Sequence, residues 1–344
     1  MKRFNPKILS LILVLSVSMA IMFLAKPGFA YTLPDCDPPG DPIVWNGYCQ
    51  NQLDILYDQS YWDDDPPEWQ ARSAAGNIAV RERFGEPERI FYGDELDTYK
   101  EYEYLDLWRS VTNGKSPILI YIHGGAWRVG SAATQGVSAE MFMEAGAHYI
   151  ALDFVNVLQT DPTGNIMEMA DEVRKAVAWV YNNAKSFKGD NKQIYISGHS
   201  SGGHLCGVVM TTDWSLYGLP PDTVKGGVCS SGMYDLYPVS LSYRGGYVNF
   251  TPEVIDLLSP INQMDFLNAP IYIIHGTKDT PEFQRQSIDF AAALQAAGKD
   301  VTYGVGVGYN HFELPETLGN PYGILGRAAL EMMGLEPNRG KKNH

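Results

Sequence analysis

Short continuous apolar runs alternate along most of this chain with segments whose apolar residues recur every three or four positions. Runs of the first kind are typical of strands buried on both faces, and the second spacing is typical of helices that pack by one face. Strands are therefore predicted over residues 90–93, 102–108, 118–122, 148–154, 193–197, 226–230, 270–274 and 301–307, and helices over 68–84, 165–186, 281–297 and 322–333. Such alternation predicts an α/β fold with a mostly parallel central sheet covered by helices on both faces.

The pattern is weaker toward the N-terminus. Residues 31–70 are rich in Pro, Gly and Asp and are interpreted as a loop-like N-terminal extension that precedes one domain over residues 71–344. An acidic run over residues 63–65 is interpreted as a solvated turn at the start of a helix. A calcium loop is the lesser alternative, because the run lacks alternating oxygen ligands. Between two predicted strands, residues 233–269 form an insertion large enough for a small lid.

The first 30 residues have the layout of a secretory signal peptide, with a basic start, an apolar run over residues 8–25, and small residues at Gly28 and Ala30. Cleavage before Tyr31 would make the mature protein periplasmic or secreted. An uncleaved membrane anchor is the alternative, since about 18 apolar residues can span a bilayer. No second apolar run of that length follows, so we expect no stable membrane insertion after cleavage.

Four cysteines occur, and none has the spacing of a zinc site. Cys36 and Cys49 lie in the N-terminal extension, which has little apolar content of its own, and in an oxidising compartment we expect a disulfide between them. Cys206 lies on a predicted helix and Cys229 on a predicted strand. For this second pair, small buried apolar residues and a second disulfide both remain open interpretations.

The chain has a formal net charge of −14. An excess of carboxylates repels nucleic acids and anionic lipid surfaces, so neither is expected as a partner. Neutral or cationic small molecules fit this charge better. No motif implies a metal or an organic cofactor, and the sequence leaves the oligomeric state open.

The strongest candidate for chemistry is the GHSSG sequence at residues 198–202, which directly follows the predicted strand 193–197 and precedes a helical start. Strand, Gly-x-Ser-x-Gly and helix in this order are the layout of a nucleophile elbow, a turn so tight that side chains at the two glycine positions would collide with their neighbours. Ser200 is therefore the candidate nucleophile. Ser201 is the alternative, but that frame would put His199 where the elbow needs a small residue.

A serine hydroxyl needs a base to take its proton as it attacks, and the base needs an acid to orient it. In this layout the partners follow the serine in the order acid, then histidine, and each lies after a strand. Asp279 follows the predicted strand 270–274 and is the candidate acid, with Asp235, after the preceding strand, as the rival. His311 follows the last predicted strand and is the candidate base.

The HGGAW sequence at residues 123–127 directly follows the predicted strand 118–122. Its two glycines allow the backbone to turn so that N–H groups point into the site, as an oxyanion hole requires. Gly125 and Ala126 are the predicted donors. The backbone N–H of Ser201 is the third, because that residue follows the nucleophile in the chain.

Together these motifs resemble the α/β-hydrolase superfamily, in the branch that holds kynurenine formamidases (arylformamidases) and hormone-sensitive-lipase-like esterases. The resemblance covers roughly residues 53–333 and depends on YDQSYW at 57–62, HGGAW at 123–127, GHSSGGHL at 198–205 and SGMYDL at 231–236. It implies the α/β-hydrolase fold and a catalytic triad of Ser200, Asp279 and His311. It also implies that Trp127 and Tyr61 lie near the acyl or aryl pocket.

We expect hydrolysis of carboxylic esters of small or aromatic substrates through an acyl-enzyme. Arylformamidase or aryl-amidase activity, on N-formylkynurenine-like or aryl amide substrates, is the alternative that the resemblance implies. Acyl transfer to another acceptor and peptidase activity remain open, and a non-catalytic binding protein is the distant alternative. The formamidases that degrade tryptophan act inside cells, so an exported chain departs from them.

Overall fold

The computed structural model describes residues 32–62 and 66–337, and the described residues from Leu33 onward form one compact unit. The predicted signal peptide over residues 1–30 lies outside the described residues. No helix within the described residues is long and apolar enough to cross a membrane.

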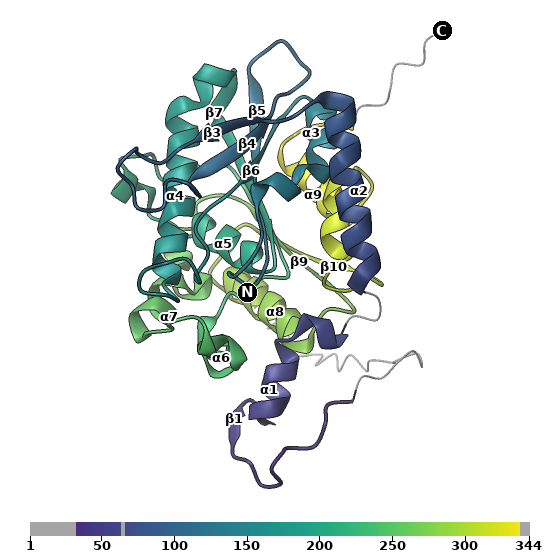
Figure 1. Ribbon diagram of the computed structural model, residues 1–344, viewed down its shortest axis with the longest axis vertical. Coiled ribbons are helices and arrows are strands. Elements are labelled where there is room, and N and C mark those ends of the chain that lie inside the picture. Colours follow the sequence, from purple (N-terminus) through teal and green to yellow (C-terminus); the bar gives the residue numbers. More distant parts are fainter. Residues whose placement is uncertain (1–31, 63–65, 338–344) are drawn as a thin grey trace, which may run out of the picture. The chain divides into compact units, whose positions relative to one another are not determined.

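An eight-stranded sheet forms the centre of this unit (Figure 1). Its strands lie in the order β10-β9-β8-β7-β5-β6-β4-β3, and among these described strands β4 alone runs opposite to the rest, so its pairings with β3 and β6 are antiparallel. The expected mostly parallel sheet is confirmed by these pairings, and each predicted strand overlaps one observed strand. The strands are β3 (Glu88–Phe91), β4 (Tyr104–Trp108), β5 (Ser116–Ile122), β6 (His148–Leu152), β7 (Gly189–His199), β8 (Gly227–Ser230), β9 (Ile271–Gly276) and β10 (Val301–Gly306).

Helices cover both faces of the sheet (Figure 1). Because side chains alternate along a strand, Ile118, Ile120 and Ile122 of β5 belong to one core and Leu119 and Tyr121 to the other. The first core includes α4, α5 and α8, and the second includes α3 and α9. The helices are α1 (Gln50–Leu56), α2 (Pro66–Phe84), α3 (Ala139–Ala145), α4 (Ile166–Asn183), α5 (Ser201–Met210), α6 (Leu236–Leu241), α7 (Pro252–Leu258), α8 (Pro281–Ala296) and α9 (Ile324–Met332).

The N-terminal segment does not have the loop-like structure that the sequence predicted. Leu53 and Tyr57 are fully buried, and the Tyr57 hydroxyl donates a hydrogen bond to Glu282 Oε2 of α8 at 3.0 Å. A helix of seven residues is too short for its apolar spacing to be recognised, and its burial depends on residues 225 positions away. Among the described residues of this segment, the helices and strands are β1 (Ile43–Trp45), β2 (Tyr48–Cys49), α1, the 3₁₀ helix η1 (Gln59–Trp62) and the start of α2.

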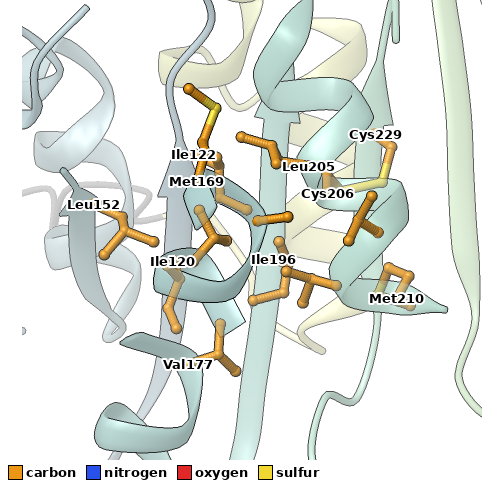
Figure 2. Packing of buried hydrophobic residues seen from close by; sticks show 14 of the residues in the cluster. Ile120, Ile122, Leu152, Met169, Val177, Ile196, Leu205, Cys206, Met210 and Cys229 are labelled. Atoms are coloured by element: carbon orange, nitrogen blue, oxygen red, sulfur yellow. A yellow bond between two sulfur atoms is a disulfide. The ribbon is translucent and has the colours of Figure 1, made fainter. Parts of the chain in front are cut away.

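Two disulfides are present, Cys36–Cys49 and Cys206–Cys229. The first is the bond expected in the N-terminal segment. The second, which the sequence left open, joins α5 to β8 within the core (Figure 2). Cys206 and Cys229 are both 0% exposed. The helix that follows Ser200 is therefore covalently tied to the neighbouring strand.

We expect the double variant Cys206→Ala/Cys229→Ala to lose roughly 3 kcal/mol of unfolding free energy. The reason is that the native bond closes a loop with a sequence separation of 23 and so restricts the unfolded chain. Urea unfolding without reductant measures the loss. The matched control is Cys36→Ala/Cys49→Ala, which opens a shorter loop with a separation of 13. Equal unfolding free energies for wild type and the Cys206/Cys229 variant would contradict the prediction.

A buried carboxyl on α4 makes stability depend on pH. Glu172 is 0% exposed, its Oε2 accepts a hydrogen bond from the Val155 N–H at 2.6 Å, and burial raises its pKa to about 8. The folded protein therefore keeps a proton that the unfolded chain releases near pH ~4.3. Stabilisation by this group is complete in acid and is lost as the pH rises toward about 8.

Glutamine stays neutral at every pH. Between about pH 5 and about pH 8, the unfolding free energy of Glu172→Gln should therefore fall by on the order of 2 kcal/mol less than that of wild type. Urea unfolding of wild type and variant at both pH values measures this difference. Glu168→Gln, a half-buried carboxyl on the same helix, is the control. A pH dependence in Glu172→Gln that equals that of wild type would refute the assignment.

Candidate active site

Ser200 occupies the turn between β7 and α5 with a φ of 60° and a ψ of −125°, a backbone conformation that most residues avoid. The flanking glycines leave no room for side chains. A Cβ at Gly198 would lie 2.1 Å from the Gly202 carbonyl oxygen, and one at Gly202 would lie 2.1 Å from the Ile122 carbonyl oxygen. The turn therefore has the sharp strand-to-helix geometry of a nucleophile elbow.

His311 and Asp279 lie together in the loops that follow β10 and β9. The Nδ1–H of His311 donates to Asp279 Oδ1 at 2.9 Å, and both side chains are buried. The same carboxylate oxygen accepts the Thr280 backbone N–H at 2.8 Å. With Nδ1 bound to the carboxylate, Nε2 is the ring nitrogen left to exchange a proton with a nucleophile. His311 and Ser200 line one cavity, so the structure brings the three predicted residues together.

The carboxylate of Asp279 is kept ionised by its surroundings. Burial by itself would raise its pKa, but the charge of His311 and the hydrogen bond from that ring outweigh burial and lower the pKa below its usual value. The Ser231 hydroxyl acts in the same direction. An ionised Asp279 stabilises the imidazolium that forms when His311 takes a proton.

His199, inside the GHSSG motif, is kept neutral. Its ring centroid lies 4.6 Å from that of His311, and its Nδ1 is hydrogen-bonded to the Ser230 hydroxyl at 3.1 Å. Burial, followed by the charge of His311, lowers its pKa to about 3. A histidine with so low a pKa does not compete with His311 for the proton of the nucleophile.

The two rival residues lie in different surroundings. Asp235 accepts the Tyr237 N–H at 3.0 Å and caps the N-terminus of α6, so its carboxylate is occupied by a helix end. Ser201 is the first residue of α5 and is 2% exposed, whereas Ser200 lies on the cavity wall. The geometry therefore favours Asp279 and Ser200 over these alternatives.

The loop over residues 123–127 follows β5 and runs along the same cavity. Gly124, Gly125 and Ala126 line it together with Ser200. A Cβ at Gly125 would lie 2.0 Å from the Val129 carbonyl oxygen, so the sharp turn at this position requires glycine. The loop brings two of the predicted oxyanion donors to the cavity of the nucleophile.

The cavity has a volume of about 700 Å³, and segments far apart in the sequence form its wall. Trp69 of α2 stacks on Phe312 with ring centroids 4.6 Å apart, and Arg72 of α2 pairs with Glu316 at 3.0 Å. Tyr243 comes from the insertion over residues 233–269, in which α6 and α7 lie. Sequence reasoning missed these residues, because no local pattern marks an aromatic or charged side chain as part of a distant cavity.

Two residues that the resemblance placed near the pocket do not line the cavity. Trp127 is 2% exposed, and its indole packs edge-on against His204 and Phe250 at centroid distances of 5.3 and 6.1 Å. Tyr61 is 40% exposed and packs edge-on against Trp62. In the part of the chain that the structure describes, neither side chain lines the cavity. A left-handed backbone at Trp127 turns the indole into the core instead.

The groups at the site are those that acyl transfer needs. A hydroxyl on a sharp turn can act as a nucleophile, an imidazole paired with a buried carboxylate can act as a base, and the loop that lines the same cavity has backbone N–H groups of the kind that an oxyanion hole uses. Across residues 32–62 and 66–337, no group of three or more His, Cys, Asp or Glu side chains is placed to hold a metal ion.

Comparison with known proteins agrees with this fold and chemistry. Two family models match the chain, BD-FAE over residues 105–215 and the prolyl oligopeptidase family over residues 168–320. Among solved structures, an esterase from Pyrobaculum calidifontis superposes with a TM-score of 0.60 at 18% identity, covering 82% of this chain and 97% of that chain. A likeness at this identity supports the fold alone.

Curated relatives identify the family. The esterase LipC of Mycobacterium tuberculosis is 30% identical, covering 74% of this chain and 65% of the relative. The kynurenine formamidase of Danio rerio is 28% identical, covering 84% of this chain and 98% of the relative. The kynurenine formamidase of Salmo salar is 32% identical over 241 residues, covering 68% of this chain and 79% of the relative. With this identity over most of the salmon enzyme, and with the fold described above, the chain belongs to the kynurenine formamidase family of α/β-hydrolases.

Proposed function

We propose that the protein is an exported serine hydrolase that cleaves carboxylic esters of small or aromatic substrates through an acyl-enzyme on Ser200. The observation that supports this best is the buried His311–Asp279 pair at 2.9 Å, with His311 and Ser200 on the wall of one cavity. The similarity to an esterase supports the same reaction type.

In this mechanism His311 Nε2 accepts the hydroxyl proton as Ser200 Oγ attacks the ester carbonyl carbon. The N–H groups of Gly125, Ala126 and Ser201 donate to the oxygen that becomes negatively charged. His311 then gives its proton to the leaving alcohol oxygen as the C–O bond breaks. A water molecule loses a proton to His311 and attacks the acyl-enzyme, which releases the acid and restores the serine.

The stacked pair of Trp69 and Phe312 supports an aromatic group in the substrate. Both rings line the cavity, and Phe312 follows His311 directly in the chain. An aromatic acyl or alcohol group can extend such a stack by offset or edge-on contact, a preference worth about 1 kcal/mol beyond the buried area. Aromatic esters should therefore be preferred to aliphatic esters of the same size.

A second candidate is hydrolysis of aryl formamides such as N-formylkynurenine, and the two fish kynurenine formamidases favour it. The same residues would act, with His311 protonating a leaving nitrogen in place of an oxygen. The formyl group is the smallest acyl group, so acyl size and leaving atom separate the two candidates.

The test is a panel on the chain that begins at Tyr31, with p-nitrophenyl acetate, butyrate and octanoate, phenyl acetate against ethyl acetate, and N-formylkynurenine against N-acetylkynurenine. We expect ester turnover, and a fluorophosphonate adduct that fragmentation mass spectrometry locates on Ser200. A higher kcat/KM for N-formylkynurenine than for every ester would establish the second candidate. No turnover of any substrate, together with no adduct, would overturn both and favour a binding protein.

Export is part of the proposal, and the two disulfides support it, because such bonds persist in oxidising compartments. The protein recovered from the periplasm or the medium should begin at Tyr31 by N-terminal sequencing. Recovery in the cytoplasm with Met1 retained would contradict this part of the proposal.

A further inference from the structure

The loop with the proposed oxyanion donors has an unfavourable backbone. Gly125, Ala126 and Trp127 follow one another with φ values of 116°, 55° and 62°. Residues with a side chain seldom adopt this left-handed region, and they stay there only where the surrounding structure holds them. Ala126 and Trp127 are two such residues in succession, so the loop needs support from outside its own backbone.

Trp127 connects the loop to that support. Its indole Nε1–H donates to His204 Nδ1 at 3.2 Å, and its carbonyl accepts the Val157 N–H at 2.9 Å. The Nε2–H of His204 in turn donates to the Leu258 carbonyl at 2.8 Å. The indole residue is 2% exposed and the imidazole residue 0% exposed, so both side-chain bonds are shielded from solvent, where hydrogen bonds are strongest.

His204 belongs to the helix of the nucleophile. It lies within the first turn of α5, and its backbone N–H donates to the Ser200 carbonyl at 3.0 Å. Leu258 is the last residue of α7. The bonds from Trp127 to His204 and from His204 to Leu258 therefore join three elements, namely the oxyanion loop, the nucleophile helix and the insertion.

We propose that Trp127 and His204 are positioning residues that hold the N–H groups of Gly125 and Ala126 at a fixed place relative to Ser200. The inference rests on the proposed function, because acyl transfer is the reaction that uses these N–H groups as donors. Neither side chain lines the cavity, so their effect reaches the substrate only through the loop backbone.

Only one form of His204 makes both bonds. Nδ1 must accept from the indole, so the hydrogen lies on Nε2 and the ring is neutral. Burial lowers the pKa of His204 to about 4, although its bond to the Leu258 carbonyl partly opposes this shift. The two bonds therefore persist throughout the neutral pH range in which an esterase assay is run.

The experiment compares three substitutions, at Trp127 and His204, with one control. Trp127→Phe keeps an aromatic ring but loses the donor, His204→Leu loses both side-chain bonds, and His204→Gln keeps one acceptor and one donor. Trp108→Phe is the matched control, because Trp108 is also 2% exposed and lies in the core on the other face of the sheet. For each variant, kcat and KM are measured on the best ester, and affinity is measured for a trifluoromethyl ketone.

We expect Trp127→Phe and His204→Leu to lower kcat roughly tenfold or more, as misplacement of an oxyanion donor would. KM should change by less than about twofold, because the ground-state ester makes little use of these N–H groups. Affinity for the ketone should fall in parallel with kcat, since its hemiketal oxyanion needs the same donors. His204→Gln should restore most of both quantities, and Trp108→Phe should leave both unchanged.

Unchanged kcat and ketone affinity in Trp127→Phe would overturn the proposal. Equal losses of kcat and ketone affinity in Trp108→Phe would also overturn it. So would losses that only follow the fraction of folded protein seen by near-UV circular dichroism, and either result would leave Trp127 and His204 with a packing role. If Trp127→Phe does not fold, the proposal is tested by whether His204→Gln restores the kcat and the ketone affinity that His204→Leu loses. Failure of the proposed function is seen separately, because wild type would then show neither ester turnover nor a fluorophosphonate adduct.

Discussion

Replacing Ser200 with alanine should lower kcat for the preferred substrate by roughly 10⁴-fold or more and abolish the fluorophosphonate adduct. Alanine lacks the oxygen that forms the acyl-enzyme, so water would have to attack the carbonyl directly. Alanine also tolerates the φ of 60° at this turn about as well as serine does. The Tm should therefore stay within about 3 °C of wild type.

Ser201→Ala separates the two possible nucleophiles. Ser201 is the buried serine next to Ser200. The variant keeps the backbone N–H of residue 201, which is the part assigned to the oxyanion hole. We expect it to retain both turnover and the adduct. Loss of activity in Ser201→Ala with retention in Ser200→Ala would show that the alternative frame is correct, and retention in both would exclude a serine nucleophile at this turn.

Asp279→Asn should lower kcat by ~10⁴-fold near neutral pH, although the two side chains have nearly the same volume. The carboxylate accepts the Nδ1–H of His311 at 2.9 Å and supplies the negative charge that stabilises the imidazolium. A neutral amide removes that charge and no longer selects the tautomer that leaves Nε2 able to accept a proton. Steady-state kinetics on the best substrate measures the loss.

The same variant should change the acid side of the stability profile. Asp279 has a lowered pKa in the folded protein, so its stabilising contribution is present above the unfolded carboxyl pKa of ~3.9. That contribution is lost as the pH falls through the folded pKa. Urea unfolding should therefore show a steeper loss of stability in acid for wild type than for Asp279→Asn.

Asp235→Asn is the matched control for the acid, because its carboxylate caps α6 and has no part in the proposed mechanism. Its kcat should stay within about tenfold of wild type, and its stability should change little, because asparagine caps a helix about as well as aspartate. A loss of kcat in Asp235→Asn as large as that expected for Asp279→Asn would reverse the assignment of the acid.

The sequence by itself determined the sheet and the order of the candidate catalytic residues along the chain. The continuous apolar run over residues 118–122 lies in strand β5, where every one of these side chains is buried, because the strand is covered on both faces. The elbow was also recognisable from sequence, since the contacts that forbid side chains at Gly198 and Gly202 arise within one tight turn and its immediate surroundings. Asp279 and His311 could then be placed, because the carboxyl ends of parallel strands meet at one edge of the sheet.

Only the tertiary structure decided what surrounds these residues. The stack of Trp69 on Phe312 joins α2 to the loop of His311, and the Cys206–Cys229 bond joins α5 to β8. Trp127 belongs to the HGGAW motif, yet its left-handed backbone and the acceptor on His204 place its indole in the core and away from the cavity. In each case the deciding quantity is a distance between segments that are separate in the chain, and the spacing of apolar and polar residues along one segment does not encode that distance.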